Sequence, residues 1–141
     1  MTPQRISLIT LGASDLERSR DFYTSLGWVP VPSPPEVVFY QLDGMVLGLF
    51  GLKPLADDQG RPGEELGTGA MSLAQNFIDR ASVDAAFAKA VEAGATALKN
   101  PKEVFWGGYS GYYADPDGHV WEVAHNPFWE IDANGKITIP A

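Results

Sequence analysis

The most informative stretch of the chain reads Tyr112-Tyr113-Ala114-Asp115-Pro116-Asp117-Gly118-His119-Val120-Trp121-Glu122-Val123. At its centre, Asp115-Pro116-Asp117-Gly118 has the residues of a tight turn. Asp caps the first position, Pro fixes φ at the second, and Gly accepts the left-handed conformation. Strand-forming residues stand on both sides of this turn. The stretch therefore predicts a β-hairpin.

Glu122 is the only charge in the apolar second strand of this hairpin. Because side chains alternate along a strand, we expect Trp121 and Val123 to face one way and Glu122 the other. A carboxylate in such a run needs a function or a partner. Two interpretations stay open. In the first, Glu122 is a functional group in a cavity. In the second, it has no functional role, and either pairs with a buried arginine or backbone donor or faces solvent.

Composition sets limits on the rest of the chain. At 141 residues it is long enough for one domain with a core, and its hydrophobic content of 45% is ordinary for a folded protein. The absence of cysteine excludes disulfides, thiolate metal sites and cysteine nucleophiles. The net charge of -8 disfavours nucleic acid and anionic membranes as partners. No apolar run has membrane-spanning length and no signal peptide is evident, so a cytoplasmic location is expected.

The first half predicts a strand at 6–11 and then a helix. The pattern from Ser14 to Glu17 is typical of a capping box, and Gly27 suits the end of the helix. Two further strands, 37–42 and 45–50, are expected around a turn at Asp43-Gly44. The segment 51–69, which is rich in glycine, proline and charge, indicates a linker or a mobile cover.

The second half repeats this plan, with a strand at 71–77, a helix, a short strand at 95–98 and the hairpin. The helix is predicted by apolar residues at helical spacing, with Ser82 as N-cap and Gly94 at its end. Those apolar residues are Val83, Ala86, Phe87, Ala90 and Val91. Each half thus predicts a β-α-β-β-β order, with one strand poorly marked in the first half.

The chain resembles the vicinal oxygen chelate superfamily, which contains glyoxalases, bleomycin-resistance proteins and extradiol dioxygenases. The resemblance extends from Arg5 to about Pro127. The matching pieces are Leu11 to Ser19, Phe22-Tyr23, Leu26-Gly27-Trp28, Val83-Asp84, Glu92 to Ala95 and Tyr112 to Glu122. It implies an α+β fold of two βαβββ modules, at about 5–52 and 70–127, whose curled sheets surround a shared cavity. The segment 51–69 would link the modules, and 128–141 would be a C-terminal tail.

The resemblance also implies four positions that hold a divalent metal in the superfamily. Carried over here they fall on Leu8, Gly48, Gln75 and Glu122, so only two of the four ligands remain, Gln75 and the family glutamate at Glu122. Gln75 is placed by setting Gly27 against Gly94, with Ser72 as the alternative. Because hard cations need several oxygen or nitrogen ligands, we expect no metal and no other cofactor, although a divalent metal is the disfavoured alternative.

Neither histidine completes such a site. His119 and His125 both stand at odd offsets from Glu122, so on a strand they point to the opposite face. We expect each to be a surface or hydrogen-bonded histidine.

Aromatic residues would line the cavity and favour a small aromatic or cationic organic ligand. Core packing is the alternative for each ring. The expected ligand contacts are Phe50, Trp106, Tyr109 and Tyr113, with polar contacts from Gln75, Asn76 and Glu122.

Three functions are compatible with these residues. The first is a metal-independent small-molecule-binding protein of the bleomycin-resistance type. The second is a metal-assisted lyase, isomerase or dioxygenase of the glyoxalase type, and Leu8 and Gly48 argue against it. The third is a metal-free enzyme in which Glu122 is the catalytic general acid or base. We favour the first, and we expect a homodimer because two β-rich modules leave sheet edges and apolar faces uncovered.

Overall fold

The computed structural model describes residues 2–141, which divide into two units, one ending at Thr68 and one spanning Gly69–Ala141. The division falls at the end of the predicted connection 51–69. None of the helices in residues 2–141 is long and apolar enough to cross a membrane.

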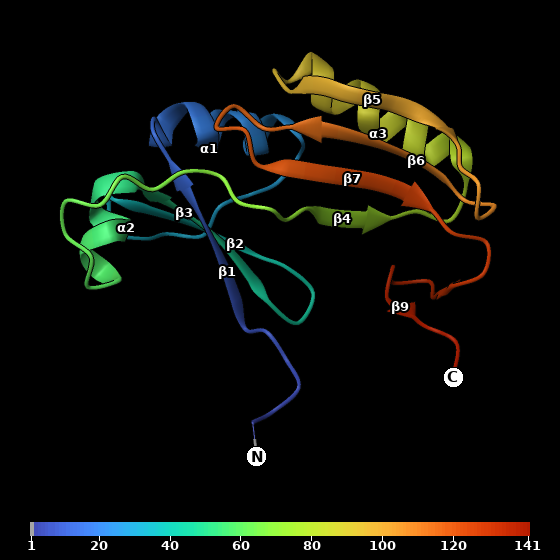
Figure 1. The fold of residues 1–141 in the computed structure, drawn as a ribbon, viewed down its shortest axis with the longest axis horizontal. Coiled ribbons are helices and arrows are strands. Elements are labelled where there is room, and N and C mark those ends of the chain that lie inside the picture. The colour runs from blue at the N-terminus through green and yellow to red at the C-terminus, as the bar shows by residue number, and fades with distance from the viewer. Residues whose placement is uncertain (1) are drawn as a thin grey trace. The chain divides into compact units, whose positions relative to one another are not determined.

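The first unit is a three-stranded sheet with two helices (Figure 1). The strand order is β1-β3-β2, with β3 parallel to β1 and antiparallel to β2. Its elements are β1 (Leu8–Ala13), α1 (Leu16–Ser25), β2 (Val37–Gln41), β3 (Val46–Gly51) and α2 (Leu52–Asp58).

The core of the first unit lies between α1 and one face of this sheet. Leu47 and Leu49 of β3 are buried there, because alternate residues of a strand share a face. The ring of Tyr23 on α1 lies 6.1 Å from that of Tyr40 on β2, and Trp28 lies 5.6 Å from Tyr40. Burial raises the pKa of Tyr40. This aromatic cluster packs α1 against the sheet.

The N-cap of α1 is Asp15 and not the predicted Ser14. The Asp15 carboxylate accepts a hydrogen bond from the Arg18 backbone N–H, whereas Ser14 accepts from the Arg18 guanidinium. Both residue types cap helices well, so the sequence pattern alone does not separate them. Gly27 follows the last turn with φ of 97°, as its predicted role requires.

The poorly marked strand of the first half is reduced to a single bridge between Val31 and Phe39. Prolines stand on both sides of Val31 and lack the backbone N–H that a strand ladder needs. The expected fourth strand is therefore absent from the first sheet in the described residues.

The segment 51–69 is not only a linker, because it begins with α2. Leu55 and Ala56 of this helix are buried, and the Leu52 side chain lies over Gly12, where an added Cβ would be 2.6 Å from it. The sequence prediction missed α2 because Pro54 and the charged residues around it are typical of a loop. Pro is tolerated in the first turn of a helix, where its missing N–H has no partner to lose.

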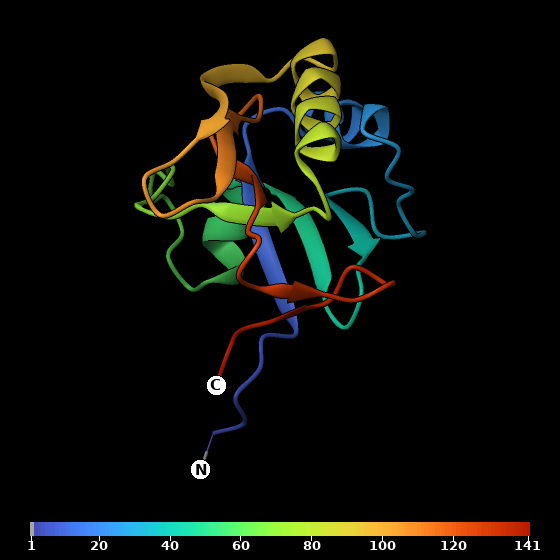
Figure 2. The same cartoon turned by 90° about the vertical axis from the view of Figure 1, so that its right-hand side faces the viewer.

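The second unit is a four-stranded sheet in the order β4-β7-β6-β5, with α3 across one face (Figures 1 and 2). Here β4 is parallel to β7, and the other pairs are antiparallel. Its elements are β4 (Leu73–Asn76), α3 (Arg80–Glu92), β5 (Thr96–Glu103), β6 (Tyr109–Ala114), β7 (Val120–His125), β8 (Glu130–Ile131) and β9 (Ile137–Thr138). The last two form a hairpin in the tail, between residues 128 and 141.

Helix α3 packs on β5, β6 and β7 with the apolar face that its spacing predicts. Val83, Phe87 and Ala90 are buried against the sheet, whereas Val91, which the spacing also predicted for this face, is 41% exposed. Its N-cap is Asp79, which accepts a hydrogen bond from the Ser82 N–H at 2.7 Å, so the predicted Ser82 cap is wrong. Hydrogen bonds from the Ser82 hydroxyl and then from its backbone N–H hold the pKa of the Asp79 carboxyl below its usual value.

Strand β5 is longer and less regular than the predicted 95–98. Its pairing with β6 shifts register twice, and Pro101 is accommodated because β5 lies at the edge of the sheet. Gly111 of β6 lies beneath this irregular stretch, where an added Cβ would be 2.8 Å from the Pro101 nitrogen. A side chain at position 111 would therefore displace β5.

We predict that Trp121→Ala lowers the free energy of unfolding by about 3–5 kcal/mol, the usual cost of removing a buried aromatic side chain. Trp121 is 5% exposed and lies opposite Tyr113 on the covered face. Denaturant unfolding measures the change. Trp129→Ala is the matched control, because Trp129 is 40% exposed and its loss should have a small effect. Equal effects of the two substitutions would contradict the packing described here.

Candidate functional site

The candidate site is a row of side chains across the second sheet, on the face turned away from α3. The face is identified by Tyr109, whose hydroxyl donates to Asp84 of α3 at 2.7 Å. Residues of even number on β6 and β7 therefore point away from the helix. Glu122 lies on this open face, with Tyr112 opposite it on β6 and Ala74 opposite it on β4.

Tyr112 and Glu122 interact directly. Burial raises the pKa of the Tyr112 hydroxyl, and both the negative charge of Glu122 and the hydrogen bond to its carboxylate raise this pKa further. Both side chains are partly buried. Within Gly69–Ala141, no lysine or arginine forms an ion pair with Glu122. The carboxylate thus has a hydrogen-bond donor but no countercharge in its own unit.

A second polar row lies beside the first. Ala124 of β7 pairs with Asn76 on β4 and with Ser110 on β6, the two strands beside β7. Asn76 therefore shares the open face with Glu122. Ser110 is buried, with 3% of its surface exposed. Ser110 was not among the site residues predicted from the sequence.

Gln75 does not share this face, so its expected place beside Glu122 is wrong. Gln75 lies opposite Val123, which is fully buried on the α3 side. The prediction set Gly27 against Gly94, but α1 has 10 residues and α3 has 13. When the N-caps Asp15 and Asp79 are set against each other, the position that corresponds to Leu8 is Ser72.

Two of the predicted aromatic contacts also lie on the covered face. Tyr113 is opposite Trp121 and only 2% exposed, and burial raises its pKa strongly. Tyr109 binds Asp84, and the guanidinium of Arg80 lies 5.0 Å from its ring centre. Both tyrosines support α3 and neither contacts Glu122.

Tyr112 is the functional candidate that the sequence argument missed. His119 belongs to the loop, because the Asp115 N–H donates to the His119 carbonyl, and so Ala114 pairs with Val120. A turn closed by Asp115–Gly118 alone would shift the pairing by one residue and put Gly111 opposite Glu122. Asp115 could have indicated the longer loop, because an aspartate side chain often accepts hydrogen bonds from backbone N–H groups that follow it.

The positions carried over to the first unit lie on one face of its sheet. Gly48 lies opposite Thr10 on β1 and Phe39 on β2, and Leu8 and Phe50 are on the same face. A Cβ at position 48 would lie 3.3 Å from the Phe39 ring and 3.5 Å from the Thr10 hydroxyl. The ring of Phe39 therefore occupies the space beside Gly48 into which a donor side chain would extend.

These residues do not fit a divalent metal. Leu8 offers no donor atom, Gly48 has no side chain, and Gln75 faces away from Glu122. In residues 2–141, no group of three or more histidine, cysteine, aspartate or glutamate side chains could hold a metal ion. Divalent cations need several such ligands, and Glu122 alone does not provide them.

Both histidines lie away from the Glu122 row. His125 is on the α3 side, and its Nδ1 is 3.0 Å from the Phe77 carbonyl oxygen. The backbone N–H of His119 donates to the Asp115 carboxylate. The prediction that His125 is a hydrogen-bonded histidine is confirmed.

Trp106 lies at the tip of the loop between β5 and β6. Its ring covers Gly108, where an added Cβ would clash with it, and the Phe128 ring lies over Gly107. Phe105 is fully exposed. These rings form an aromatic tip on the second unit, and the contact that places Trp106 is with Gly108 and not with Glu122.

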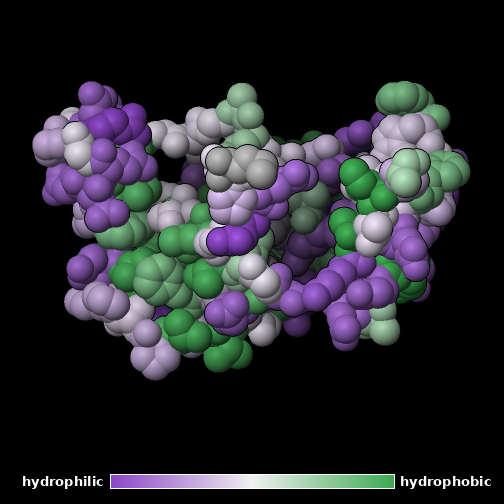
Figure 3. Space-filling model, turned by 90° about the horizontal axis from the view of Figure 1, so that it is seen from below, coloured by the Kyte–Doolittle hydropathy of each residue, from purple (hydrophilic) through white to green (hydrophobic). Residues whose placement is uncertain are grey.

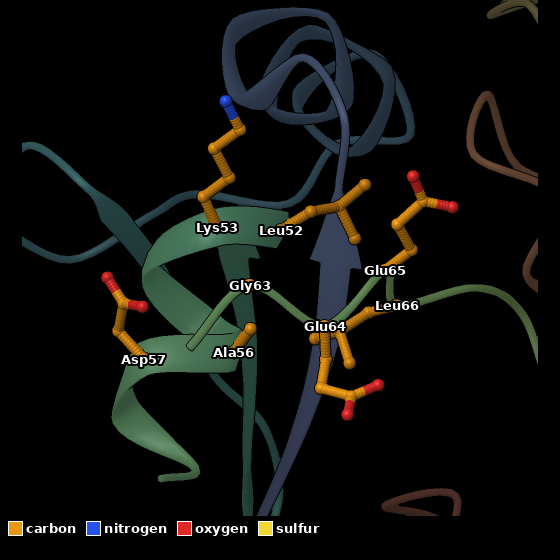
Figure 4. A pocket seen from close by; sticks show the side chains of 8 residues that line it. All are labelled: Leu52, Lys53, Ala56, Asp57, Gly63, Glu64, Glu65 and Leu66. Atoms are coloured by element: carbon orange, nitrogen blue, oxygen red, sulfur yellow. The ribbon is translucent and has the colours of Figure 1, made fainter. Parts of the chain in front are cut away.

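A cavity of about 560 Å³ lies in the first unit between α2 and residues 63–66 (Figure 4). Leu52, Ala56 and Leu66 give it apolar walls. Figure 4 shows that Lys53 and the carboxylates of Asp57, Glu64 and Glu65 point in different directions. Because these charges do not converge, the cavity lacks the arrangement of polar groups that fixes a ligand.

Comparison with known proteins identifies the family. Residues 5–123 match the model of the Glyoxalase/Bleomycin resistance protein/Dioxygenase superfamily. A glyoxalase-related enzyme from Fulvimarina pelagi is 41% identical, with a TM-score of 0.91 over 99% of this chain and 100% of that one. A lactoylglutathione lyase from Agrobacterium tumefaciens is 25% identical, with a TM-score of 0.71 over 93% of this chain and 100% of that one.

A third similar structure is a glyoxalase/bleomycin resistance protein/dioxygenase from Nocardioides, 23% identical, with a TM-score of 0.75 over 89% of this chain and 85% of that one. No curated protein matches the chain. The family match covers most of the sequence and includes both α1 and the hairpin of β6 and β7. The chain belongs to the Glyoxalase/Bleomycin resistance protein/Dioxygenase superfamily.

Proposed function

We propose that the protein binds a small cationic organic molecule without the help of a metal, and that Glu122 receives the positive charge. One observation carries this proposal: Glu122 stands on the open face of the second sheet with the Tyr112 hydroxyl as its partner and no countercharge in its unit. A partly buried carboxylate is stabilised when a cation approaches it. A ligand cation would supply that charge.

The charge of the chain and the nature of its neighbours support this class of ligand. A net charge of -8 attracts cations and repels phosphate-rich partners. Ala74 and Ala124 flank Glu122 with side chains that end at Cβ and carry no polar atom that could compete for the carboxylate. We therefore place binding at the row of Ala74, Glu122 and Tyr112.

A second candidate is a metal-free enzyme in which Glu122 moves a proton. The hydrogen bond between the Tyr112 hydroxyl and the Glu122 carboxylate favours it, because such a pair can take up and deliver a proton. A metal-assisted lyase or dioxygenase is disfavoured by the donor set, although one similar structure is a lactoylglutathione lyase. Turnover of a bound ligand would distinguish an enzyme from a binding protein.

We predict that Glu122→Gln weakens binding of protonated benzylamine by about ten-fold or more, as the loss of a charged hydrogen-bond acceptor does. Isothermal titration with benzylammonium measures this, and the neutral benzyl alcohol serves as the matched probe that should bind weakly to both proteins. The melting temperature should change little. If Glu122 is structural, the substitution instead destabilises the fold by about 3–5 kcal/mol and leaves affinity unchanged.

We predict that the protein purifies without a stoichiometric divalent metal when no chelator is used. The physical reason is that Leu8 and Gly48 provide no ligand atoms. Elemental analysis of the purified protein is the measurement. A stoichiometric content of zinc, iron, manganese or nickel that disappears in Glu122→Ala would refute the metal-independent proposal.

We also propose that the protein is a homodimer. Each sheet has two edge strands, and both units expose apolar side chains, with hydrophobic patches visible among hydrophilic ones in Figure 3. Such edges and patches favour association. The exposed residues include Ile6, Leu8, Val29, Ile78, Phe105 and Phe128.

We predict a dimer mass by light scattering over a wide range of protein concentration. Dissociation on dilution would indicate a weak dimer, for which the measured mass should fall toward that of one chain. A monomer mass at every concentration would contradict this part of the proposal.

A further inference from the structure

We propose that the row formed by Ala74, Glu122 and Tyr112 selects cations that carry N–H donors, such as primary ammonium and amidinium groups, over quaternary ammonium. This inference rests on the proposed function, because it concerns the cation that Glu122 receives. It goes beyond that function by assigning a specificity to Tyr112.

The hydrogen-bond donors and acceptors of Glu122 and Tyr112 lead to this selectivity. An ionised carboxylate only accepts hydrogen bonds, and a tyrosine hydroxyl has one hydrogen to donate. Tyr112 stands directly opposite Glu122, whose carboxylate is an acceptor for that hydrogen. The Tyr112 oxygen therefore has only acceptor capacity left, so both functional groups offer acceptors to a ligand.

The arrangement of the strands places these two acceptors side by side. Tyr112 and Glu122 are directly opposite each other on β6 and β7, a pairing in which Cβ atoms lie about 4.5–5.5 Å apart. A group with two or more N–H bonds can donate to the carboxylate and to the phenol oxygen at once. A trimethylammonium group carries no N–H, so it can satisfy neither acceptor.

The flanking residues do not compensate for a missing donor. Ala74 stands on the β4 side of Glu122, and Ala124 is the next residue of β7 on the same face. Neither side chain has a polar atom. A quaternary cation would therefore gain only the charge attraction of Glu122, while its methyl groups keep the positive nitrogen farther from the carboxylate.

The experiment compares two probes of equal charge, benzylammonium and benzyltrimethylammonium, by isothermal titration. The unmodified protein should bind benzylammonium about ten-fold more tightly, since it donates charged hydrogen bonds that benzyltrimethylammonium cannot make. Tyr112→Phe removes one acceptor and should weaken benzylammonium about 3–10-fold. The same substitution should leave the affinity for benzyltrimethylammonium unchanged.

Tyr109→Phe is the matched control. Tyr109 lies on the same strand and also donates to a carboxylate, that of Asp84, but it does so on the α3 face. Its substitution should alter neither affinity. Comparison of the melting temperatures of the two variants shows whether each has folded, and the probe preference of the unmodified protein tests the inference without any variant.

Four results would overturn the inference. Equal affinity of the unmodified protein for both probes would remove the selectivity itself. An equal loss for both probes in Tyr112→Phe would mean that the hydroxyl only positions Glu122. If both cations bind but neither depends on Glu122, or if neither binds, the proposed function fails and this inference fails with it.

Discussion

The register between β6 and β7 is the constraint on which the arrangement of the second unit depends. It is set by one buried side chain, Asp115, whose carboxylate accepts the backbone N–H groups of Asp117 and His119 and so includes His119 in the loop. Because strand side chains alternate, this single choice sends Trp121 and Tyr113 beneath α3 and puts Glu122 and Tyr112 together on the open face. A shift by one residue would put Gly111 opposite Glu122 and Tyr112 opposite Trp121, so both pairs would be separated.

The two units have a similar order of strands and helices, but the strands of the second unit are more complete. In the second, regular strands support a full sheet, and the position of Glu122 carries a charge. In the first, prolines reduce one strand to a bridge, and the equivalent position is Gly48, beside which the Phe39 ring lies. An aromatic ring over a strand glycine protects backbone that has no side chain of its own. Gly48 thus offers no donor atom, and the Phe39 ring fills the space beside it.

The sequence was sufficient where local chemistry is specific. The hairpin, the glycines at the ends of both helices, most of the apolar face of α3 and the placement of Glu122 opposite to Trp121 and Val123 all follow from turn residues or periodicity. It was insufficient where the position of a residue depends on the length of a helix or a loop elsewhere in the chain. Gln75 was misplaced because α1 and α3 differ in length, and Tyr112 was missed because one loop residue changes the pairing. Helix α2 was missed because Pro54 suits both a loop and a first helical turn.

Tyr112 and Glu122 also show why a hydrogen bond does not replace a countercharge. The phenol stands opposite the carboxylate but leaves its negative charge in place, and that charge adds to burial in raising the pKa of Tyr112. The rest of this acidic chain adds to the negative potential around the pair. A neutral ligand would have to desolvate the carboxylate without neutralising it, at a cost of several kcal/mol. A cation that donates hydrogen bonds avoids that cost, because it brings the missing charge and satisfies the remaining acceptors in one contact.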